Sequence, residues 1–147
     1  MHFLGETSTG FSNKFKNILL AFFIYALYIF LFSKFMEFLY TGQFFKEPPF
    51  KLTFFMTCIY SPLIEELIFR VAPISLVKDK PKLILPTIIL SSALFGWLHY
   101  GAASLPIQGV FGFVLSLVYL KNNHSYWSVV ALHALWNSYV LFILEKL

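Results

Sequence analysis

Five long apolar runs set the main constraint on this sequence. They extend over about residues 18–39, 52–77, 83–100, 105–120 and 127–144, and prolines, glycines, asparagines and charged residues separate them. Runs of this length are typical of helices that cross a lipid bilayer, each of which needs about 20 apolar residues. The sequence therefore predicts an all-α, polytopic bundle of transmembrane helices. Because the fourth run is short, we expect four to five membrane helices.

The composition agrees with a single membrane domain. Five helices of about 20 residues would use about 100 residues, which leaves no room for a separate soluble domain in a chain of 147 residues. Charged residues make up only 12% of the chain, against about 25% in soluble domains. This composition excludes a disordered chain, a coiled coil and a disulfide scaffold. Cys58 has no second cysteine to pair with, and we interpret it as a small apolar helix residue.

The lysines predict an orientation in the membrane. The net charge is +4, but the bases are spread thinly, which gives little support to nucleic-acid binding. One side of the predicted bundle carries Lys14, Lys16, Lys78, Lys80, Lys82 and Lys121, and the other carries Lys46, Lys51 and Lys146. The richer side is expected to be cytoplasmic. We therefore expect a multi-pass protein of the cell membrane with its N-terminus, interpreted as uncleaved, in the cytoplasm.

Three charged residues lie deep in the second run. Charges at membrane depth are costly, so they normally face the protein interior and have partners. Glu66 and Arg70 are four residues apart, with the glutamate on the N-terminal side, which favours an ion pair on one helix face. Glu65 points about 100° away from Glu66. Glu65 must therefore find a partner on another helix, stay protonated or face a water-filled cavity.

Two further polar clusters lie in the third and fifth runs. Phe95 and His99 are four residues apart, and so are His133 and Asn137, so each pair shares a helix face. A carboxylate, two imidazoles and an amide from three helices can converge on one buried point. Such a set can activate a water molecule and stabilise an oxyanion.

These three segments resemble the signature motifs of the CAAX-protease and bacteriocin-processing (CPBP, or Abi) family of intramembrane proteases. The motifs read EELIFR (Glu65, Glu66, Arg70), FGWLH (Phe95, His99) and HALWN (His133, Asn137). Each motif alone is weak, but all three in order, each on its own predicted membrane helix, are a strong signal. The resemblance covers about residues 62–137 of the single domain 1–147.

The resemblance implies an endopeptidase that acts on a membrane-associated peptide or protein tail. It implies that Glu65 activates water with help from His99, and that His133 and Asn137 stabilise the tetrahedral oxyanion. It also implies that Glu66 and Arg70, with Phe95 packed nearby, hold the site together. Glu65, His99 and His133 are candidates for a zinc site of the His₂Glu type. Because the sequence has no His-Glu-x-x-His helix, we favour water activation without a metal.

Small residues form two stripes on the predicted helices. Gly109, Gly112 and Ser116 share one face of the fourth helix, and Ser92 and Gly96 share one face of the third. In membranes such stripes allow helix backbones to approach closely. We therefore expect these residues to serve helix packing and not ligand binding.

The depths of the motif residues present a geometric difficulty. Along straight helices, Glu65 would lie about 20 Å from the lysine-rich side and His99 about 25 Å from it, whereas His133 would lie about 10 Å from it. Breaks at Pro73, Pro81 or Pro86 offer one way to bring them together.

Other functional classes stay open at this point. A non-catalytic membrane immunity or scaffold protein is the main alternative, because the chain has about one helix before the first motif where many family members have more. The smaller number of helices around the site can equally mean a homo-oligomer, a more open site or an inactive minimal protein. A proton-coupled carrier is a third possibility, against which the lack of an inverted repeat argues.

Overall fold

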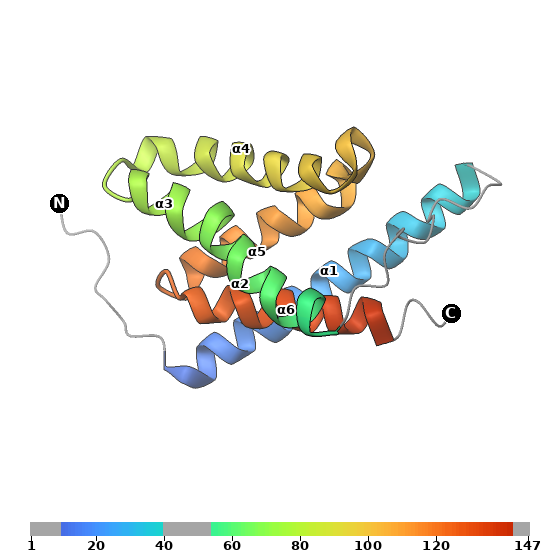
Figure 1. The fold of residues 1–147 in the computed structure, drawn as a ribbon, viewed down its shortest axis with the longest axis horizontal. Coiled ribbons are helices and arrows are strands. Elements are labelled where there is room, and N and C mark those ends of the chain that lie inside the picture. Colours follow the sequence, from blue (N-terminus) through green and yellow to red (C-terminus); the bar gives the residue numbers. More distant parts are fainter. Residues whose placement is uncertain (1–9, 40–53, 143–147) are drawn as a thin grey trace.

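The computed structural model describes residues 10–39 and 54–142. Within these ranges the chain forms helices and short turns with no strands (Figure 1). In order, the elements are α1 (Phe11–Leu39), η1 (Met56–Tyr60), α2 (Ser61–Glu66), η2 (Leu67–Val71), α3 (Ala72–Val77), α4 (Pro81–Tyr100), η3 (Gly101–Ser104), η4 (Leu105–Gly109), α5 (Val110–Lys121) and α6 (Tyr126–Phe142). The predicted all-α class is therefore confirmed.

Each predicted apolar run forms helix. The first helix begins at Phe11, earlier than expected, so the polar segment before the first run continues the helix. The helix of the third run, α4, begins at Pro81. Proline suits the first turn of a helix, because the N–H that it lacks would have no partner there. The predicted end of the fifth run and the lysines Lys46, Lys51 and Lys146 lie outside the described residues.

The number of membrane crossings stays a prediction. By length and apolarity, two stretches of the described chain qualify as membrane spans, Phe11–Met36 and Pro81–Lys121. The second contains α4, α5 and the turn between them, where Gly101 adopts a φ of 65°. The two helices lie side by side after this turn (Figure 1). These two stretches are long and apolar enough to cross a membrane, as the sequence predicts.

The second run is one continuous helix that contains two widened turns. In η1 the Ser61 N–H donates to Met56 O, and in η2 the Ala72 N–H donates to Leu67 O. Each of these bonds spans five residues and directly precedes a proline, Pro62 or Pro73. A proline removes one backbone donor and crowds the carbonyl four residues earlier, and a π turn relieves this crowding. The helix therefore passes through Pro73 without breaking, as α4 passes through Pro86.

Side chains of neighbouring helices bind carbonyls in the turns that precede these prolines. Thr57 O accepts a hydrogen bond of 2.8 Å from Asn137 Nδ2 on α6. Phe69 O, four residues before Pro73, accepts one from Ser91 Oγ on α4. In lipid no water can serve such a carbonyl, so a neighbouring side chain must. The two prolines thus fix where α6 and α4 attach to the second helix.

Helix α1 closes one side of the core. Its Tyr25 is buried, and its ring packs against Phe111 of α5 and Trp136 of α6, with centroids 4.7 and 4.5 Å away. The Tyr25 hydroxyl donates to Ile107 O at 2.8 Å, and Tyr28 donates to Pro106 O. These two hydroxyls attach α1 to η4.

The predicted small-residue stripes are contact points. A Cβ added at Gly96 of α4 would lie 2.7 Å from the backbone nitrogen of Gly109. A Cβ at Gly112 would lie 2.7 Å from an amino nitrogen of Arg70. Gly96 and Gly112 therefore have no room for a methyl group, which confirms the packing interpretation.

Replacing Gly96 by alanine should destabilise the crossing of α4 with η4. The new methyl meets backbone, which cannot rotate away, so we expect the free energy of unfolding in detergent to fall by about 1–3 kcal/mol. Gly109→Ala is the matched control, because its Cβ would meet nothing closer than 3.6 Å. Equal losses in the two variants would contradict this account.

Three segments that carry the lysine-rich set lie at one end of the bundle. They are the start of α1, the α3–α4 turn and the α5–α6 turn (Figure 1). Buried Asn122 joins two of them, since its Oδ1 accepts a 2.7 Å bond from Asn17 Nδ2 and its Nδ2 donates to Lys14 O at 3.3 Å. The six lysines of the richer set therefore lie on segments at one end of the described bundle, whereas the comparison with Lys46, Lys51 and Lys146, which lie outside the described residues, and the orientation stay predictions.

Candidate active site

A buried ion pair forms the base of the site. Arg70 Nε lies 3.3 Å from Glu66 Oε2, and both side chains are fully buried. The Arg70 guanidinium also lies over the Phe95 ring, 4.2 Å from its centroid. The predicted ion pair is therefore confirmed, and Phe95 supports its arginine.

The same glutamate orients a histidine from α6. His133 is buried, and its Nδ1 lies 2.7 Å from Glu66 Oε1. A carboxylate accepts hydrogen bonds, so we assign the ring proton to Nδ1. In the neutral ring the opposite nitrogen, Nε2, is then a proton acceptor. Helix α6 reaches this position because the Tyr126 hydroxyl at its start donates to Leu63 O, 2.8 Å away.

Glu65 lies on the other side of the His133 ring. Its Oε2 is 3.8 Å from His133 Nε2, and its side chain is 25% exposed. Its Oε1 accepts a hydrogen bond from Ser61 Oγ, one turn earlier. Its Oε2 is buried and accepts no hydrogen bond from the described part of the chain. Oε1 of Glu65 is therefore held by Ser61, whereas Oε2 is vacant, meaning that it has no hydrogen-bond donor in the described part of the chain, and it faces the His133 imidazole.

His99 reaches this cluster through Phe95. Its Nδ1 donates to Phe95 O at 2.8 Å, and its ring packs edge-on against the Phe95 ring, with centroids 4.7 Å apart. The Phe95 ring also contacts the His133 ring at 5.8 Å. Among residues 10–39 and 54–142, no hydrogen bond or ion pair links His99 to Glu65 or His133. In the described part of the chain, His99 is therefore connected to His133 through the Phe95 ring.

Asn137 lies one turn beyond His133 on α6. Its amide donates to Thr57 O, so it binds the second helix two turns before Glu65. The amide has a second hydrogen for which this contact leaves room. The structure thus brings Glu65, Glu66, Arg70 and His133 together, and sets His99 and Asn137 at the edge of the group.

The sequence did not single out Ser61, although its position four residues before Glu65 is the spacing of helix neighbours. Thr57 was also missed. Its partner depends on the helix widening at Pro62, which spacing alone does not reveal.

The described side chains do not form a metal site with three ligands. In the described ranges, no group of three histidine, cysteine, aspartate or glutamate residues is close enough to hold a metal ion. The zinc site expected from Glu65, His99 and His133 therefore stays a prediction, and no chemical step below depends on it.

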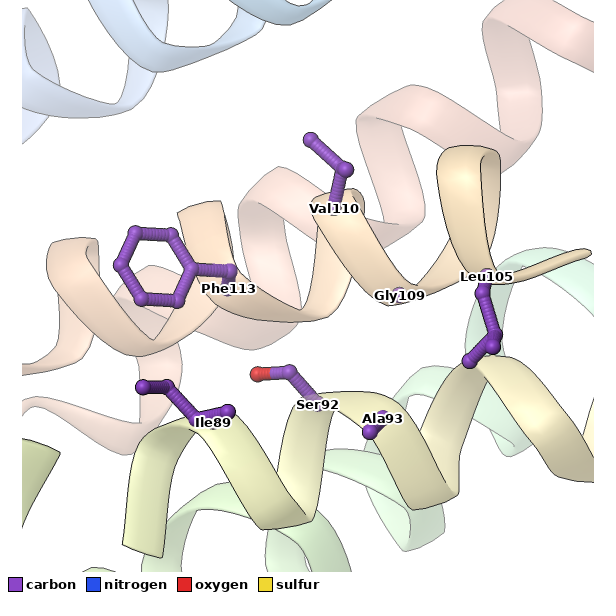
Figure 2. Close-up of a pocket in the computed structure, with 7 residues that line it drawn as sticks. All are labelled: Ile89, Ser92, Ala93, Leu105, Gly109, Val110 and Phe113. Atoms are coloured by element: carbon purple, nitrogen blue, oxygen red, sulfur yellow. The ribbon is translucent and has the colours of Figure 1, made fainter. Parts of the chain in front are cut away.

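A separate groove lies between α4 and α5. It has a volume of about 340 Å³, and Figure 2 shows the residues that line it: Ile89, Ser92, Ala93, Leu105, Gly109, Val110 and Phe113. Its only polar side chain is Ser92, whose hydroxyl points into the gap. None of its seven lining residues belongs to the set of motif residues Glu65, Glu66, Arg70, Phe95, His99, His133 and Asn137.

The comparison with known protein families identifies the chain. The model of the type II CAAX prenyl endopeptidase Rce1-like family matches residues 47–139. The chain belongs to this family. The match to the Rce1-like family includes all three motifs and the whole polar cluster, whereas α1 precedes it. Comparisons with curated proteins and with solved structures gave no match.

Proposed function

We propose that the protein is an intramembrane endopeptidase that hydrolyses a peptide bond in the tail of a membrane-attached protein. Membership in the Rce1-like family supports the reaction class. The observation that carries the proposal is the vacant Oε2 of Glu65 facing His133 Nε2. A buried carboxylate oxygen without a donor is costly, and a water molecule held there would satisfy it.

In this mechanism Glu65 acts as the general base. It takes a proton from the bound water as the water oxygen adds to the substrate carbonyl carbon. The carbonyl oxygen becomes an oxyanion. When the carbon–nitrogen bond breaks, the proton passes from Glu65 to the leaving amine. The products are a new carboxyl end and a new amine, and no metal takes part.

The remaining site residues position Glu65 and stabilise charge. His133 can donate to the oxyanion only when Nε2 carries a proton, because Nδ1 is bound to Glu66. Asn137 can donate with the amide hydrogen that Thr57 does not use. His99 would assist Glu65 by turning its free nitrogen toward the water. Glu66 and Arg70 hold the His133 ring, and Phe95 supports them.

We further propose a CAAX tail as the substrate and the cytoplasmic face of the cell membrane as the place of reaction. A prenyl chain on the tail cysteine keeps a substrate at the bilayer. A carboxylate that is one-quarter exposed can meet a tail delivered in this way. The lysine-rich end of the bundle then faces the cytoplasm.

Cleavage by the purified protein tests the proposal. The full chain is reconstituted in lipid vesicles with a peptide that ends in a prenylated CAAX sequence, and mass spectrometry identifies the products. We expect one internal bond to be cut, and cut faster than in the same peptide without the prenyl chain. Intact prenylated peptide after long incubation with a folded protein would overturn the proposal and favour a non-catalytic role.

A further inference from the structure

Ser61 makes a side-chain contact that is unusual for a serine in a helix. Helical serines often donate to the carbonyl four residues earlier. Ser116 does so to Gly112 O and Ser138 to Ala134 O, at 3.0 and 2.8 Å. Ser61 instead donates forward to Glu65 Oε1. Its hydroxyl has two acceptors within reach, one turn back and one turn ahead.

The acceptor one turn back is Thr57 O, and Asn137 already binds it. The Asn137 amide donates to Thr57 O at 2.8 Å, and the Ser61 N–H is used by Met56 O. A carboxylate is a stronger acceptor than a carbonyl, and Glu65 places one a single turn ahead, so the hydroxyl donates forward. The direction of the Ser61 hydroxyl therefore follows from the carboxylate of Glu65 on the same helix face.

The forward bond fixes the Glu65 carboxylate. Holding Oε1 from the Ser61 side leaves Oε2 on the side of His133, 3.8 Å from Nε2. The charged groups packed near this carboxylate are His133 and Glu66, with Arg70 behind Glu66. None of them binds Oε1 in the described part of the chain. Ser61 is thus the group that decides which oxygen of Glu65 is vacant.

We propose that Ser61 is a positioning residue for the reaction. Its hydroxyl holds Oε1 and so orients Glu65 with Oε2 free to take a proton from water. This inference rests on the proposed function of Glu65 as the base. Ser61 itself forms no bond to the substrate.

Replacing Ser61 by alanine tests this role through kinetics. We expect kcat on the prenylated CAAX peptide to fall about 10- to 100-fold, the order of loss that misplacing a reacting group causes, while KM changes less than about twofold. Ser61→Thr keeps the hydroxyl and should restore most of kcat. Ser138→Ala is the matched control, because it removes a serine hydroxyl that binds only backbone, and it should leave kcat unchanged. Loss of activity in Ser61→Thr equal to that in Ser61→Ala would overturn the proposal.

A spectroscopic measurement separates this inference from the proposed function. The infrared difference between the wild type and Glu65→Gln isolates the band of the Glu65 carboxyl group. We expect Ser61→Ala to shift that band and Ser138→Ala to leave it in place, whether or not the protein cleaves peptides. An unshifted band in Ser61→Ala would overturn the positioning role even in an active enzyme. Covalent labelling of Ser61 by a fluorophosphonate probe would also overturn it, since that reaction marks a nucleophile.

Discussion

Replacing Glu65 by glutamine should reduce cleavage of a prenylated CAAX peptide by about 100- to 10,000-fold, the range over which a positioned general base acts. Glutamine has nearly the shape of glutamate, and its oxygen can still accept the Ser61 hydroxyl bond. Its amide nitrogen can donate to the vacant Nε2 of His133. The fold should therefore survive while the group that accepts the proton is lost. Single-turnover cleavage, followed by mass spectrometry, measures the effect.

Asp79→Asn provides the control for this experiment. It removes one carboxylate, as Glu65→Gln does, but from the exposed α3–α4 turn, and it should leave the rate unchanged. Thermal unfolding in detergent confirms that both variants are folded. A folded Glu65→Gln protein that cleaves at the wild-type rate would remove Glu65 from the mechanism.

Replacing Arg70 by methionine should lower the free energy of unfolding by about 3–5 kcal/mol, the cost of leaving one member of a buried ion pair alone. Glu66 is fully buried and would keep only His133 as a partner. The methionine fills much of the volume of the arginine side chain, so lost charge and not lost packing dominates the effect. Unfolding in detergent at several denaturant concentrations gives the value.

A double variant separates charge from packing. Glu66→Gln with Arg70→Met removes both charges, and the glutamine oxygen can still accept the His133 Nδ1–H. Since replacing both members of a buried pair is often nearly neutral, we expect this variant to regain most of the lost stability. Lys121→Met, which removes an exposed cation at the end of α5, should change stability by less than about 0.5 kcal/mol. A double variant as unstable as Arg70→Met would refute this account of the pair.

Local spacing in the sequence was enough to predict much of the fold and the base of the site. Apolar runs predicted the helices, and the spacing of four residues predicted the Glu66–Arg70 pair, because neighbours on one helix face depend only on helix geometry. The same spacing put Phe95 beside His99 and predicted the close approach at Gly96. These contacts need no knowledge of how helices are placed relative to one another.

Contacts between helices at different depths could not be predicted in this way. Straight helices with level ends would keep His133 away from Glu65. The structure brings them together because the Tyr126 hydroxyl at the start of α6 binds Leu63 O, two residues before Glu65. No break at Pro73 or Pro86 is involved.

The sequence also could not predict which side chains bind the backbone carbonyls near Pro62 and Pro73. Pro62 and Pro73 reveal that some carbonyl nearby lacks a donor. Which carbonyl is left depends on whether the preceding turn widens, and which side chain serves it depends on the helix alongside. Asn137 and Ser91 bind the carbonyls of Thr57 and Phe69.

The contact of Tyr25 with Phe111 and Trp136 shows that the packed core is longer than the segment that matches the family. The segment that matches the family begins at residue 47. The packed core begins earlier, because it includes the buried Tyr25 of α1. A protein cut at the edge of the recognisable segment would expose an indole and a phenyl ring that are buried here. The family match therefore marks the segment that carries the three motifs, and the aromatic contacts show that the packed core also includes α1.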